Sequence, residues 1–483
     1  MTTLTDSRPS YELVPSNIAQ ALVGLLRDGP FATFSPTPVK DFFWNEEDYG
    51  RFARIAETVD KSLRISCKAT FEEVIGLIRD DLRNKQCRGV LVDGSTFTAK
   101  MSHGQESNNT FFFECDHWLV KHTDSDPCTW IARIEGKHGL SVGNLSVNLY
   151  MPNEDGDPAL QCAQRGFRLR GHHTYYIVSH QEHDYLVIDT GGEPLDIKHL
   201  SFDFMTLEFV AGTRLGLGFM QGLNVEGKVV AHAGGSYGHR RRNGEHETSR
   251  PAIGRPQLVE SGWAIAFFDA TCAAHEQHSE YDLDSALGFY LNSIGDVVDG
   301  ECIKLHIALE GLALRMVGKA KVYRTQDHKS WLRWCDDNAD AIKNLSLKGK
   351  ETSLFDAVRR ADAIGASSVV EVAFTQLDIK LPPLVLVELE TRNKLVHEGR
   401  LPRNVPFDVD RFVLHADAPR TLLLALIAKA VGYDGPIRGY DKHDSGWPSV
   451  PDWWHMGDAP PPMASKSHLV IVGADIDAGA QWI

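Results

Sequence analysis

Residues 382–399 read PPLVLVELETRNKLVHEG, and this stretch marks both ends of a helix. Pro382 and Pro383 suit a first helical turn, where a missing backbone N–H costs nothing. Gly399 follows at the position where helices commonly end in a left-handed residue. The stretch therefore predicts a helix over Leu384–Glu398 and a helical region in the second half of the chain.

The helical pattern begins at about Asp282. Apolar residues recur at about helical spacing in Cys302–Val317, namely Ile303, Ile307, Leu309, Leu312, Leu314 and Met316. Gly432 marks the end of a helix that we expect over Arg420–Val431. The remaining expected helices are Ser353–Ile364, with Ser353 as its N-cap, Asp284–Ser293 and Ser330–Ile342.

The sequence before this region, from about Leu63 to Phe268, has mostly the pattern of strands. β-Branched and aromatic runs alternate there with turn residues. The predicted strands are Thr110–Cys115, Thr129–Ile134, Leu145–Tyr150, Thr174–Val178 and Tyr185–Asp189. A helix is expected at Phe71–Leu82, with Thr70 and Glu73 as a capping box. A further helix is expected around Ser16–Arg27, whereas Asp203–Leu217 is ambiguous between helix and strand.

These patterns predict an α+β multidomain protein with a β-rich N-terminal domain followed by an all-α helical bundle. A length of 483 residues fits two to four domains at roughly 150 residues each. We expect an extended, partly helical lead-in at 1–60 and a β-rich sensor or regulatory domain at 61–270. The bundle is expected at 275–435, and a tail with prolines and tryptophans at 436–483.

Composition excludes several classes of protein. Lys and Arg number 50 against 65 Asp and Glu, a net charge of −15, which argues against a polybasic nucleic-acid binder but not against a local basic cleft. The 8 cysteines form no Cys-x-x-Cys pair and are typical of reduced thiols. The first residues do not resemble a secretory signal, and the longest apolar run is too short to span a membrane. We expect a cytoplasmic protein without a membrane partner.

No metal or cofactor motif is present in the sequence. The strongest metal candidates are the pairs His172-His173, His180-x-x-His183 and His275-x-x-His278, and none lies in a His-Glu-x-x-His frame. Gly216-x-Gly218-x3-Gly222 has the wrong spacing for a dinucleotide loop, and a Gly-x-Ser-x-Gly elbow is missing. We therefore expect no metal ligands and no cofactor.

One motif in the helix at Leu384–Glu398 points to chemistry. Arg392 is followed directly by Asn393 and, five residues after the arginine, by His397. Other Arg/His pairs have this spacing, such as Arg168 with His173 and Arg241 with His246, but neither of these has the asparagine. Asparagine slightly destabilises the interior of a helix, and the neighbouring sequence offers no compensation. Its presence here therefore favours a functional site.

The segment Arg392-Asn393-Lys394-Leu395-Val396-His397 resembles the Arg-Asn-x-x-x-His signature of HEPN domains. This family consists of all-α bundles, many of which are metal-independent ribonucleases. Leu305–Leu312 resembles the family's "ALExL" helix, which makes Glu310 the candidate acidic partner. The resemblance covers about Asp282–Tyr433. A β-rich part joined to such a bundle also resembles the ApeA-type anti-phage proteins.

The resemblance implies a metal-independent endoribonuclease that acts on RNA. Asn393 and His397 share a helix face at i,i+4, so the amide can orient the imidazole, whereas Arg392 lies ~140° from His397. His397 would take the proton of the RNA 2′-OH, which attacks the adjacent phosphorus, and Arg392 would stabilise the charge on the phosphoryl oxygens. Because one helix does not aim both groups at one phosphate, the implied cleft is shared by a homodimer.

The implied biological role is that of a toxic effector in anti-phage defence by abortive infection. An unknown trigger, such as a phage-derived one, would act on the N-terminal domain. Lys394 and the loop residues Arg240, Arg241 and Arg242 are candidate contacts to the RNA backbone. For the three loop arginines the alternative is a solvated surface loop.

Three alternatives stay open at this point. Arg392 can pair with Glu388 on the helix surface, with His397 serving as a favourable charge near the helix C-terminus. The bundle can be a non-catalytic dimerisation scaffold whose β domain binds a ligand or a protein. The protein can also be a toxin that a partner nucleotidyltransferase modifies.

Overall fold

The protein is described here by a computed structural model of its 483 residues. The structure describes residues 37–44, 47–48, 53–59, 62–67, 86–107, 110–135, 145–152, 158–180, 183–235, 237–238, 262–318, 327–345, 351–362, 366–382, 409–440, 467–472 and 481–482, with the single positions 18, 21, 22, 252, 388, 389, 395, 401, 451, 453 and 454. The chain divides into two compact units. The β unit comprises Met1–Glu245, Leu258–Cys272 and Pro460–Ile483, and the helical unit comprises His246–Gln257 and Ala273–Ala459.

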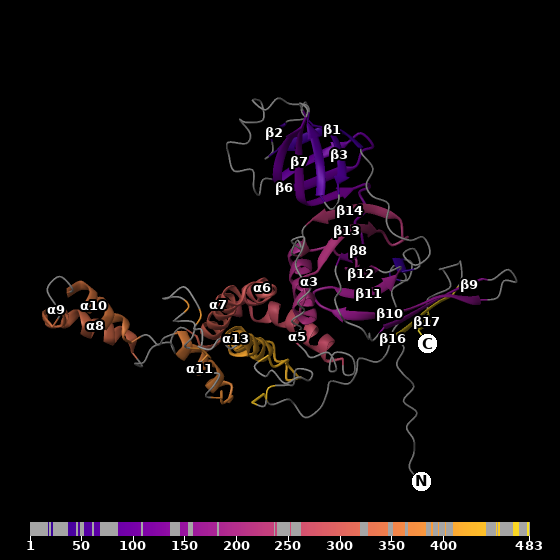
Figure 1. The fold of residues 1–483 in the computed structure, drawn as a ribbon. Helices are drawn as coiled ribbons and strands as arrows, with labels where there is room; N and C mark the ends of the chain where they lie inside the picture. The colour runs from indigo at the N-terminus through magenta and orange to yellow at the C-terminus, as the bar shows by residue number, and fades with distance from the viewer. Residues whose placement is uncertain are drawn as a thin grey trace, which may run out of the picture. The chain divides into compact units, whose positions relative to one another are not determined.

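The first strands of the β unit pair in a closed ring (Figure 1). In ring order they are β1 (Thr37–Trp44), β5 (Gln86–Leu91), β6 (Thr96–Ser107), β7 (Thr110–Lys121), β4 (Ser62–Cys67) and β3 (Ala53–Val59), which returns to β1. All of these pairings are antiparallel. A closed ring leaves few unpaired backbone edges, which is how small barrels protect their strands.

A second run of antiparallel strands continues from the end of β7. It follows the order β14 (Val229–Gly235), β13 (Gly216–Leu223), β8 (Thr129–Glu135), β12 (His183–Asp189), β11 (Thr174–His180), β10 (Pro158–Arg170) and β9 (Leu145–Pro152). Strand β16 (Ser467–Val472) then adds to β9 in parallel and carries β17 (Gln481–Trp482). Two short strands, β2 (Glu47–Asp48) and β15 (Tyr237–Gly238), pair with β1 and β13.

Helix α3 (Ile197–Ala211) belongs to the β unit, and ten of its 15 residues are buried. The Asp196 carboxylate caps its start by accepting the backbone N–H groups of Lys198 and His199 at 2.7 and 3.3 Å. Gly212 ends the helix with a φ of 64°, a left-handed conformation that suits glycine. The ambiguous stretch Asp203–Leu217 is therefore the last part of α3 followed by the start of β13.

Four helices form the core of the helical unit. Helix α7 (Val298–Val317) packs against α6 (Leu283–Ser293), α11 (Ala366–Gln376) and α13 (Val409–Ala430). A group of shorter helices packs mainly on itself and comprises α8 (His328–Asp337), α9 (Ala339–Asn344) and α10 (Glu351–Arg360). Helix α5 (Trp263–Gln277) and the short helix η1 (Ser279–Tyr281) join the two units along the chain.

The succession of strands and helices confirms a β-rich region followed by a helical one. All five strands predicted by range lie within observed strands. The helices expected at Asp284–Ser293 and Cys302–Val317 are α6 and the main part of α7. Strands β1 to β3 fall within the expected lead-in, and β16 and β17 fall within the expected tail.

Some predicted helix boundaries were wrong. Helix α10 begins at Glu351, so Ser353 lies inside its first turn and is not the N-cap. Helix α13 begins at Val409 rather than Arg420 and contains Pro419. Residues 415–428 of this helix are all buried, and this packing outweighs the local cost of the proline. The helix expected over Ser330–Ile342 is two helices that meet at Asn338.

Two predicted helices fall largely outside the described residues. Phe71–Leu82 and its capping box at Thr70 and Glu73 lie wholly outside them. Of Ser16–Arg27, Ile18, Ala21 and Leu22 are described, and they are helical and buried. Within the described part of the chain, no helix is long and apolar enough to cross a membrane.

Candidate functional site

The residues proposed to cleave RNA fall in a segment of which only a few positions are described. Arg392, Asn393, Lys394 and His397 lie outside the described residues, and so do Arg240, Arg241 and Arg242. Glu388, Leu389 and Leu395 are described, and all three are helical and buried. These positions agree with the helix expected over Leu384–Glu398.

Glu388 has a buried tertiary partner. Its Oε2 accepts a hydrogen bond at 2.5 Å from Nδ1 of His415, a residue of α13. Glu388 is 3% exposed, and His415 is buried as well. An exposed ion pair between Glu388 and Arg392 was the alternative explanation for the arginine. Because this carboxylate is buried against another helix, it does not belong to a solvated helix surface.

Glu310, the candidate acidic residue, lies on α7. Its Oε1 is 4.0 Å from Nδ1 of His306, one helical turn earlier, and its side chain is mostly shielded from solvent. Three exposed apolar side chains share this face of α7 with Glu310 at helical spacing, namely Ile303, Ile307 and Leu314, with exposed fractions of 36%, 45% and 39%. We call these three residues the α7 stripe. The apolar pattern in Cys302–Val317 comprised these three residues and also Leu309, Leu312 and Met316. Of the six side chains, those of Leu309 and Leu312 are buried.

A buried arginine connects the core helices of this unit. Arg420 of α13 is fully buried, and its Nη2 lies 3.4 Å from Oε1 of Glu301 on α7. Its guanidinium also lies over the rings of Tyr290 on α6 and Tyr440, 5.3 and 5.7 Å from their centroids. Burial alone would lower the pKa of Arg420, but Tyr290 and Glu301 raise it, so the side chain stays charged. The cluster holds α6, α7 and α13 together around one charge.

The β unit contains a cavity of about 820 Å³. Two buried indoles, Trp118 and Trp130, line it. Three cations, Arg88, Lys100 and Lys121, line it against one carboxylate, which is Asp126 and accepts a hydrogen bond from Lys121 at 2.5 Å. The excess of positive charge beside aromatic surface suits a small anionic ligand with a planar ring.

A second group in the β unit has the composition of a metal site. The imidazole of His172, the carboxylate of Asp203 and the thiol of Cys272 place their ligand atoms within 4.8 Å of one another. Of the histidine pairs considered in the sequence, His172-His173 contributes one member to this group. Asp203 and Cys272 were missed because they are distant in sequence and belong to no recognisable spacing.

Comparisons with protein-family models, curated proteins and solved structures found no match to this chain.

Replacing Arg420 with Met should strongly destabilise the helical unit. The change leaves the buried Glu301 carboxylate without its cation, a loss that typically costs about 3–5 kcal/mol. The free energy of unfolding, measured with urea and followed by circular dichroism, checks this. The matched control is Lys429→Met on the same helix, because the pair of Lys429 with Asp434 is partly exposed and should contribute at most about 1 kcal/mol. Equal losses in the two variants would contradict the structural role of Arg420.

Proposed function

We propose that this protein is a metal-independent endoribonuclease of the HEPN type, whose helical unit cleaves RNA and whose β unit regulates the cleavage. The observation that carries the proposal is the motif Arg392-Asn393-x-x-x-His397. It is supported by the helical, buried character of Glu388, Leu389 and Leu395 and by the buried pairing of Glu388 with His415.

The proposed reaction needs no group beyond the side chains and the RNA itself. His397 removes the proton of the 2′-OH, and the resulting alkoxide attacks the adjacent phosphorus. The 5′-oxygen of the next nucleotide leaves and takes up the proton that His397 had removed, and a 2′,3′-cyclic phosphate remains. Arg392 stabilises the charge on the phosphoryl oxygens, Asn393 orients the imidazole, and Lys394 contacts the backbone. Arg240, Arg241 and Arg242 are proposed as further contacts to the RNA, and Glu310 as the acidic partner.

We also propose that two copies of the chain form the active cleft through α7. The α7 stripe is an exposed apolar surface on a helix that otherwise packs in the core, and it flanks Glu310. A second copy would bury this surface against its own stripe in a two-fold arrangement.

The role that we propose for this activity is anti-phage defence by abortive infection, in which a phage-derived trigger acts on the β unit. This role rests on the resemblance to HEPN and ApeA-type proteins. Restraint before the trigger arrives is expected because a ribonuclease that is always active would harm its own cell.

The substitution His397→Ala should abolish RNA cleavage. Loss of a general acid–base group typically lowers the rate by roughly 10²–10⁴-fold. The measurement uses total RNA and tRNA in the presence of EDTA, with the product ends mapped. Cyclic-phosphate or 3′-phosphate ends are expected from the wild type. The control is His278→Ala, since His278 lies on the exposed surface of the helical unit beside Glu280. Undiminished cleavage by the His397 variant would contradict the mechanism.

The substitution Ile307→Asp should separate the dimer. It places a charge in the centre of the α7 stripe, where a second copy would have to bury it without a partner. The molar mass in solution, from light scattering, should fall from that of two chains to that of one, and RNA cleavage should fall with it. Leu345→Asp is the control, because Leu345 is exposed on the same unit and does not belong to the stripe. A wild-type mass of one chain would rule out this interface.

A second candidate function, ligand binding by the β unit, is favoured by the cavity beside Trp118 and Trp130. Its charge and aromatic lining suit a nucleotide, so ATP should bind and quench the tryptophan fluorescence saturably. The double variant Arg88→Glu/Lys100→Glu should weaken binding by roughly tenfold or more, since charge-assisted hydrogen bonds contribute about 1.5–3 kcal/mol each. Lys228→Glu, an exposed change outside the cavity lining, is the control. No saturable quenching of the wild type by ATP, GTP or cyclic nucleotides would contradict this function.

A further inference from the structure

The carboxylate of Asp203 organises a buried polar cluster in the β unit. Asp203 lies on α3, and its Oδ2 accepts hydrogen bonds from the backbone N–H of His172 at 2.8 Å and from the Tyr175 hydroxyl at 2.5 Å. Its Oδ1 accepts one from Nδ1 of His172, also at 2.5 Å. The side chains of His172 and Asp203 are both 1% exposed. The turn between β10 and β11 therefore lies directly against α3.

The close approach of this turn depends on Gly171. A Cβ atom at this position would lie 2.3 Å from Oδ2 of Asp203, which is far closer than a carbon and an oxygen can pack. Glycine brings the His172 backbone and imidazole up to the same carboxylate. The imidazole is also held by packing, because it stacks on His199 at 4.2 Å between centroids and lies perpendicular to the ring of Phe202.

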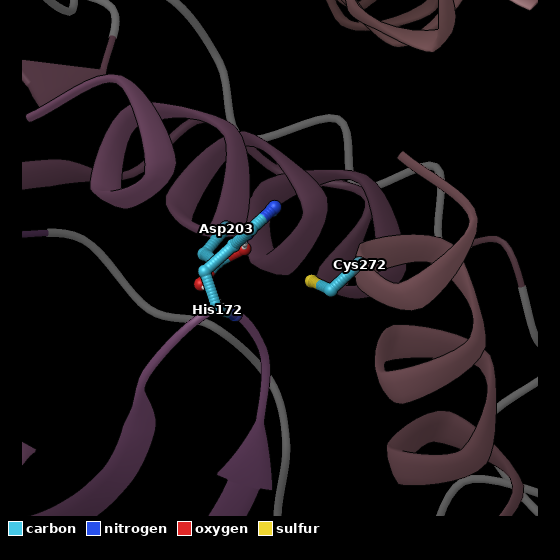
Figure 2. Close-up of side chains that lie close together, drawn as sticks. All are labelled: His172, Asp203 and Cys272. Atoms are coloured by element: carbon cyan, nitrogen blue, oxygen red, sulfur yellow. Dashed lines mark hydrogen bonds and ion pairs between the residues drawn. The ribbon is translucent and has the colours of Figure 1, made fainter. Parts of the chain in front are cut away.

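Helix α5 delivers the third member of the cluster. Figure 2 shows the sulfur atom of Cys272 directed toward His172 and Asp203 from this helix. Asp269, one turn earlier on α5, accepts the backbone N–H of Arg170 at 2.9 Å. Asp269 thus attaches α5 to the end of β10, directly before the turn that carries His172.

The local environment argues against a catalytic cysteine. Burial, and then the Asp203 carboxylate, raise the pKa of the Cys272 thiol well above its ordinary value. A nucleophilic cysteine needs the opposite shift and access to a substrate. Cys272 is buried, so it also lacks the access to a substrate that a nucleophile needs.

The three side chains form the nitrogen, oxygen and sulfur donor set that zinc uses in proteins. The ligand atoms lie within 4.8 Å of one another. A dication bound to one thiolate, one carboxylate and one neutral imidazole has no net charge, which favours its burial. We propose that His172, Asp203 and Cys272 bind one Zn²⁺ ion, which ties α3 and α5 to the turn between β10 and β11.

Binding changes the protonation of two ligands. Cys272 releases its thiol proton to solvent and coordinates through the thiolate. The proton on Nδ1 of His172 moves to Nε2, so that Nδ1 coordinates beside Oδ1 of Asp203. Tetrahedral zinc holds such a nitrogen and oxygen roughly 3.3 Å apart, so the present 2.5 Å hydrogen bond opens by less than about 1 Å. One position of a tetrahedral ion is left to a ligand other than these three.

The test uses Co²⁺ as a spectroscopic substitute for Zn²⁺ in the reduced, chelator-treated full-length protein. One equivalent should give the absorption of a tetrahedral ion together with a sulfur-to-cobalt charge-transfer band in the near ultraviolet. Zn²⁺ should displace the cobalt and abolish both. Absence of the charge-transfer band in the wild-type protein would overturn the proposal, whatever any variant does.

Matched cysteine variants locate the ion. Cys272→Ser should lose the charge-transfer band and bind Co²⁺ at least about tenfold more weakly, since serine is a poor ligand for this class of metal. Cys115→Ser, a change at an equally buried cysteine of β7, should keep the wild-type band and stoichiometry. Far-ultraviolet circular dichroism in chelator verifies that both variants fold. An undiminished band in folded Cys272→Ser would place the ion elsewhere and overturn the assignment.

Discussion

The pairing of β7 is the constraint on which the β unit depends. Each backbone N–H and C=O in a buried strand needs a hydrogen-bond partner. One edge of β7 pairs with β6, whereas the other edge is divided between β4 at 111–115 and β14 at 117–121. The ring and the longer run of strands therefore share one strand, and neither can be removed without exposing unpaired backbone groups. The cavity takes residues from both, since Lys100 belongs to the ring and Trp130 to β8.

Both units also bury charges whose partners come from distant parts of the chain. In the β unit the Asp203 carboxylate receives hydrogen bonds from the β10–β11 turn and from β11. In the helical unit Arg420 meets Glu301, and Glu388 meets His415. A buried charge is tolerated only when such partners surround it, so each cluster makes the packing of its helices specific.

The proposed activities assign different chemistry to the two units. The proposed cleavage through the RNA 2′-OH would rely on proton transfer and charge stabilisation by side chains of the helical unit. The proposed zinc ion would belong to the β unit and act on its architecture, far in sequence from the motif at 392–397. The nucleotide-sized cavity adds a place where a small signal can bind to the same unit. In the proposed function, a signal bound to the β unit would regulate cleavage by the helical unit.

Sequence alone determined that a β-rich region precedes a helical one, because β-branched runs and helical periodicity are local properties. It also supplied the motif at Arg392, Asn393 and His397, since a spacing within one predicted helix can be recognised from the sequence alone. Tertiary structure decided where α13 begins, because packing along residues 415–428 overrides the signal of Pro419. It also decided that Ile303 and Ile307 of α7 face outward while Leu309 faces inward, which periodicity cannot distinguish when both faces are apolar. The grouping of His172, Asp203 and Cys272 likewise depended on the fold, because only the folded chain brings one turn and two helices to a single point.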